Sequence, residues 1–131
     1  MTDKEFRLVN RVIKRSINKW LNTMGFRRWT VTHTLYRELK EGEPDCTASC
    51  DAQWEYQNMW LKFYGPKCGS LAEKELEEVV VHELMHGLVN QMREWASDKM
   101  HHEEHVVTQL TQAIMWARWD GVQEGKRKKG K

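Results

Sequence analysis

One stretch of the chain carries residue types that can hold a metal ion at a fixed spacing: His82-Glu83-Leu84-Met85-His86. Helical residues four apart are separated by about 6 Å of rise and lie on one face, so both imidazoles project from the same side. Two ring nitrogens on one face can share a zinc ion. Glu83 can take a proton from a water molecule at the site without being a ligand. The pattern predicts one zinc ion per chain, bound by His82 and His86, with Glu83 as the catalytic base.

A catalytic zinc ion usually has three protein ligands, and the segment 100–105, Met-His-His-Glu-Glu-His, offers the third. At about 100° per residue, the apolar positions that follow lie within about 60° of Glu103, which predicts that Glu103 points inward. An inward carboxylate without a cation is costly, and zinc would compensate it. Glu104 lies about 100° away and His105 nearly opposite. We therefore expect Glu103 as the third ligand, with Glu104 and then His105 as the alternatives.

The composition fits one globular domain, because the chain has 131 residues, 40% of them hydrophobic and 31% charged. Cys46, Cys50 and Cys68 are an odd number of cysteines, and charges rather than an apolar run follow the N-terminus. We therefore expect reduced thiols, no signal peptide and a cytoplasmic location. No apolar stretch approaches the ~20 residues of a membrane span, so we expect no membrane partner.

The net charge of +2 is unevenly distributed. Residues 1–40 carry ten Lys and Arg against three Asp and Glu, whereas residues 41–125 carry six against sixteen. Five cations then fall within residues 126–131. We predict a single domain over residues 1–120 and a basic, disordered tail over residues 121–131. The tail could contact nucleic acid through phosphates, but nothing around it offers base readout.

Hydrophobic periodicity predicts the elements that precede the motif. Thr2 and Glu5 form a capping box for an amphipathic helix that ends at Gly25. Beyond it, alternating residues predict three strands. The predicted strands are 29–35, 46–56 and 59–64, with turns at 42–45 and 57–58.

Two helices are predicted after the strands. Ser70 and Glu73 form a second capping box for a helix over residues 71–95 that carries the motif, and Asp98 could begin the last helix. The expected fold class is α+β: an N-terminal helix, a small three-stranded, mainly antiparallel sheet, the motif helix and a C-terminal helix that bears the glutamate.

The motif His82-Glu83-x-x-His86 with a downstream inward Glu103 resembles the gluzincin branch of the zincin metallopeptidases. Metzincins have Gly and His three and six residues after the second histidine, where this chain has Val89 and Met92. The layout is most similar to minimal gluzincin-like proteins, including metallopeptidases encoded by bacteriophages. The resemblance implies a zinc-dependent peptide-bond hydrolase of unknown substrate, in the host cytoplasm if phage-encoded.

Two functions follow from these residues. In a hydrolase, Glu83 would pass the proton to the leaving amine, and His101, His102 or Tyr64 would be the oxyanion donor. A peptide could add to a sheet edge, and 59–64 is the strand nearest the motif in sequence. The alternative is a non-catalytic zinc-bound module that docks on nucleic acid or an acidic protein partner. Glu83 favours the hydrolase, because a structural zinc site has no use for a carboxylate there.

Overall fold

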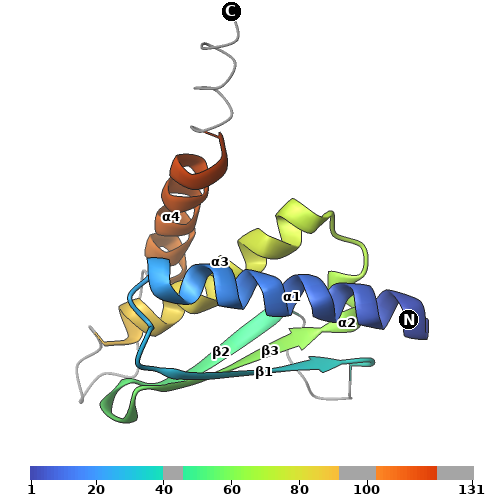
Figure 1. The fold of residues 1–131 in the computed structure, drawn as a ribbon, viewed down its shortest axis with the longest axis horizontal. Helices are drawn as coiled ribbons and strands as arrows, with labels where there is room; N and C mark the ends of the chain where they lie inside the picture. The colour runs from blue at the N-terminus through green and yellow to red at the C-terminus, as the bar shows by residue number, and fades with distance from the viewer. Residues whose placement is uncertain (40–45, 92–102, 121–131) are drawn as a thin grey trace, which may run out of the picture.

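A computed structural model describes residues 1–39, 46–91 and 103–120, and it confirms the α+β fold class (Figure 1). The elements in chain order are α1 (Asp3–Thr23), β1 (Thr30–Tyr36), β2 (Ala48–Gln53), η1 (Trp54–Tyr56), β3 (Asn58–Tyr64), α2 (Gly65–Cys68), α3 (Glu73–Asn90), α4 (Glu103–Met115) and η2 (Trp116–Asp120). The predictions for the turn at 42–45, for Asp98, His101 and His102, and for the tail at 121–131 fall outside the described residues.

The first helix begins and ends as its sequence predicts. The Glu5 backbone N–H donates to Thr2 Oγ1 at 3.2 Å, and the Thr2 backbone N–H donates to Glu5 Oε2 at 2.7 Å, which confirms the capping box. After the C-cap residue Met24, Gly25 has φ +81°, a left-handed conformation that glycine adopts without the cost of a Cβ. The helix buries one side, made of Val9, Ile13, Ser16, Ile17 and Trp20.

The sheet is mixed rather than mainly antiparallel, because β1 pairs in parallel with β3 while β2 pairs antiparallel with it. The strand order is β1-β3-β2, so the strand next to the motif in sequence is the central one. The short helix η1 and Gln57, at φ +52°, join β2 to β3 as an antiparallel hairpin. Alternation along β3 buries Met59, Leu61 and Phe63 and leaves Trp60 exposed.

The helices α1 and α3 lie over one face of this sheet (Figure 1). Gly87 of α3 permits a close approach, because a Cβ there would overlap the Met59 side chain and lie 3.2 Å from Phe26 Cζ. The helix starts after Ala72, which makes no side-chain cap, and the Ser70 hydroxyl instead donates to Lys67 O at 2.9 Å. The second predicted capping box is therefore wrong, because the turn after α2 uses the Ser70 hydroxyl. Within the described residues, no helix has the length and apolar character needed to cross a membrane.

Candidate metal centre

The two histidines of the motif lie at the edge of the buried side of α3. Their ring centroids are 5.0 Å apart with an angle of 72° between the planes, as expected for residues four apart on one helix face. Both side chains are partly exposed, His82 by 25% and His86 by 16%, whereas the neighbouring Val81, Leu84 and Met85 are buried. The core therefore holds the helix while the imidazoles stay accessible.

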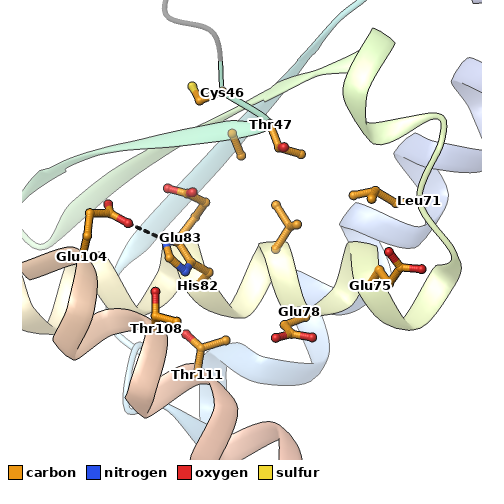
Figure 2. A pocket seen from close by; sticks show the side chains of 12 residues that line it. Cys46, Thr47, Leu71, Glu75, Glu78, His82, Glu83, Glu104, Thr108 and Thr111 are labelled. Carbon is orange, nitrogen blue, oxygen red and sulfur yellow. Dashed lines mark ion pairs between the residues drawn. The ribbon is translucent and has the colours of Figure 1, made fainter.

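The third residue of the group comes from α4. The Glu104 carboxylate places Oε1 at 2.8 Å from His86 Nε2 and Oε2 at 3.2 Å from His82 Nε2, and Figure 2 marks the His82 contact with a dashed line. One ligand atom from each of these residues lies within 4.8 Å of the others. Tetrahedral zinc with bonds of about 2.0–2.2 Å separates its ligand atoms by about 3.3–3.6 Å. The donor atoms of this group lie within 4.8 Å of one another, so they are close enough to share such an ion.

Glu103, which sequence reasoning preferred as the ligand, occupies a different place. Its side chain is buried as the helical phase predicts, and its Oε1 lies 3.6 Å from His86 Nδ1, the ring nitrogen that faces away from the group. This separation is that of an ion pair rather than of a hydrogen bond, so the Glu103 charge favours an N–H at Nδ1 and leaves Nε2 as the nitrogen for a metal ion. The structure thus brings Glu104 to the two histidines and places Glu103 behind His86.

Glu83 lies beside the group but is buried within the same helix, with 5% of its surface exposed. Burial raises the pKa of the Glu83 carboxyl to about 8, and the charge of Glu104 adds to the effect. Burial also lowers the pKa of His82, helped by His86 and opposed by Glu104. The His82 ring is therefore biased toward the neutral form, which is the form that binds metal ions.

A cavity of about 550 Å³ opens beside the group (Figure 2). Its lining comes from the start of β2 and the residues before it, from α3 and Leu71 before it, and from α4. The residues are Cys46, Thr47, Ala48, Leu71, Glu75, Glu78, Val79, His82, Glu83, Glu104, Thr108 and Thr111. A second, smaller cavity of about 150 Å³ is lined by residues of β2 and by His86 and Glu103.

The remaining predicted site residues lie apart from this group. His105 is exposed on α4, as its phase predicts, and is not part of the group. Tyr64 is buried and stacks on Tyr36 with ring centroids 5.7 Å apart, and it lines neither cavity. Cys46, Cys50 and Cys68 form no disulfide within the described part of the chain.

The prediction that a peptide adds to 59–64 is wrong, because β3 is paired on both of its edges. The edge strand that lies against α3 is β2, and the chain entering it lines the larger cavity. Sequence reasoning also missed the cavity residues Glu75 and Glu78. They precede His82 by seven and four residues, so helical spacing alone could have identified them as neighbours on one face.

No protein-family model matches the chain, and neither a curated protein nor a solved structure matches it.

Proposed function

We propose that the chain is a zinc-dependent peptide-bond hydrolase of the gluzincin kind, in which His82, His86 and Glu104 hold the metal and Glu83 is the general base. The observation that carries the proposal is the meeting of two imidazole Nε2 atoms with a carboxylate from a second helix at the wall of an open cavity. Two imidazoles and one carboxylate are a donor set of catalytic zinc sites, which leave a coordination position for substrate.

When bound, zinc would supply Lewis acidity, which polarises a carbonyl and makes water a better proton donor. The chain's own contribution to the chemistry is the movement of the proton. Glu83 lines the cavity next to His82, where it can take a proton from the attacking water and release it to the leaving amine.

The edge strand β2 provides a means of positioning an extended peptide. Thr47 and Ala48 line the cavity at the start of this strand, and His82 of α3 lines the same cavity (Figure 2). A peptide could pair with the edge of β2 that no other strand of the described sheet occupies. It would then lie along β2 and present its carbonyl groups to the metal group. Backbone pairing of this kind gives affinity for many sequences, so selectivity must come from side-chain pockets.

The proposal is tested with the Glu83→Gln variant of the full chain. Glutamine keeps the size of the side chain but accepts no proton at neutral pH, so turnover should fall about 10²-fold or more. Zinc content by elemental analysis and the melting temperature should stay close to those of the wild type. Substrates are first found by mass spectrometry of a mixed peptide library.

The matched control is Glu73→Gln, a change of the same kind on α3 at a residue that pairs with Arg15 of α1. This variant should keep both zinc and turnover. Hydrolysis that survives Glu83→Gln undiminished would contradict the assigned role of Glu83. A zinc-bound chain that cleaves nothing in the library would favour the non-catalytic module instead.

A further inference from the structure

The larger cavity continues from the metal group toward the amino end of α3, and its wall there is acidic. Glu78 and Glu75 both line it, on the helix face that carries His82. The other acidic residues of these turns point to the opposite side, where Glu73 pairs with Arg15 and Glu77 pairs with Lys19 of α1. The charges of α3 are thus divided between a paired side against α1 and a side that faces the cavity.

A buried hydroxyl on the opposite wall also calls for a hydrogen-bond donor. Thr111 of α4 is 2% exposed, and its Oγ1 has no hydrogen-bond partner among the described residues. It lines the same cavity, and in Figure 2 its side chain points from α4 toward α3, with its oxygen on the side of His82 and Thr108. An unpaired buried hydroxyl is costly, so a ligand that brings an N–H group to this point gains from satisfying it.

The wall between the acidic groups and the metal group is partly apolar. Val79 and Leu71 contribute aliphatic surface to the same cavity. Glu78 is one helical turn from His82, about 6 Å along the axis, which the four-carbon stem of lysine can span. Aliphatic surface followed by carboxylates and a hydroxyl acceptor matches a side chain with an alkyl stem and a cationic head, since ammonium and guanidinium groups are donors only.

We propose that this cavity binds the basic side chain of a substrate residue next to the scissile bond, so that the substrates are peptides with Lys or Arg at that position. The inference rests on the proposed hydrolase function, because only a hydrolase has a scissile bond. The binding itself depends only on Glu78, Glu75 and Thr111, and can be measured without turnover.

The test is calorimetric binding of two blocked dipeptides that differ only in one side chain, lysine or norleucine. Norleucine keeps the four-carbon stem and lacks the ammonium group. The protein is the full chain with Glu83→Gln, so that no peptide is consumed. The lysine peptide should bind about tenfold more tightly, the effect expected of a charge-assisted hydrogen bond. Adding Glu78→Gln should reduce this preference to about threefold or less.

Thr111→Val provides a second variant, because valine replaces the hydroxyl with a methyl group of similar size and leaves the charges in place. It should also lower the lysine preference, and it carries the test if Glu78→Gln fails to melt cooperatively. Glu73→Gln, on the paired side of α3, should leave the preference unchanged. Equal binding of the two peptides, or a lysine preference that persists in both cavity variants, overturns the inference.

The library digest separates this inference from the proposed function. Cleavage that depends on Glu83 but shows no enrichment of Lys or Arg beside the cut bond leaves the hydrolase standing and overturns the basic pocket. A lysine preference in binding, without cleavage of any peptide, supports the pocket and contradicts the hydrolase.

Discussion

The carboxylate of Glu104 lies 2.8 Å from Nε2 of His86, although Glu104 belongs to the exposed flank of α4. The residue before it, Glu103, lies 3.6 Å from Nδ1 of the same ring. Adjacent carboxylates therefore approach opposite ends of one imidazole, one within the metal group and one behind it. This arrangement assigns the two glutamates different roles that substitution can separate.

We predict that Glu104→Gln lowers zinc affinity more than Glu103→Gln does. Loss of a carboxylate behind a metal-binding histidine typically costs about 10–100-fold in affinity, whereas loss of Glu104 removes a ligand. Competition with a chromophoric chelator measures both affinities on the full chain. The double variant His82→Ala/His86→Ala should bind no zinc tightly, and serves as the reference for a destroyed site.

The opposite order would return the ligand role to Glu103, the residue that helical phase favours. Zinc retained by the double histidine variant would show that the metal binds elsewhere in the chain.

Glu77 should make stability depend on acid pH. It is buried and accepts hydrogen bonds from Lys19 Nζ at 2.8 Å and Trp20 Nε1 at 2.7 Å. Burial raises the pKa of its carboxyl, but the hydrogen bonds from Lys19 and Trp20 outweigh burial, so the pKa lies below its ordinary value of 4.5. A pKa that is lower in the folded than in the unfolded state stabilises the fold above pH 4.5. This stabilisation is lost as the pH falls through the pKa of the folded state.

Glu77→Gln should therefore lower the free energy of unfolding by about 1–2 kcal/mol at neutral pH, measured by urea denaturation. The difference from the wild type should shrink as the pH falls below about 4. Glu73→Gln is the control, because its ion pair with Arg15 is exposed and should contribute about 0.5 kcal/mol or less. If the difference in the free energy of unfolding between the wild type and Glu77→Gln were the same in acid as at neutral pH, the role assigned to the Glu77 charge would be contradicted.

Cys68 should resist alkylation in the folded protein. Its side chain is buried, its thiol donates to Thr47 O at 3.6 Å, and burial raises its pKa to about 11. At pH 8 only about one thiol in a thousand would be ionised, and the thiolate is the reactive form. A time course with iodoacetamide, read by mass spectrometry of peptides, should show Cys68 modified far more slowly than in urea. Equal rates in both conditions would show that the α2 region opens readily.

The elements that sequence predicts well are those whose signals are local. The Thr2–Glu5 capping box depends on two residues three apart, and the alternation of Met59, Leu61 and Phe63 reports one buried side of a strand. The strand order carries no such signal, because every residue offers the same backbone donors and acceptors to a neighbour. The parallel pairing of β1 with β3 is therefore visible only in the folded chain.

The same division holds at the metal centre. The sequence by itself determined that His82 and His86 share one helix face and that Glu103 turns inward, because helical spacing and phase relate residues of one helix to each other. Only the tertiary structure decided that Glu104 reaches both Nε2 atoms, and that Glu78 and Thr111 line one cavity. Phase tells which side of α4 is buried, but the way α4 packs against α3 determines which flank of its first turn meets the histidines.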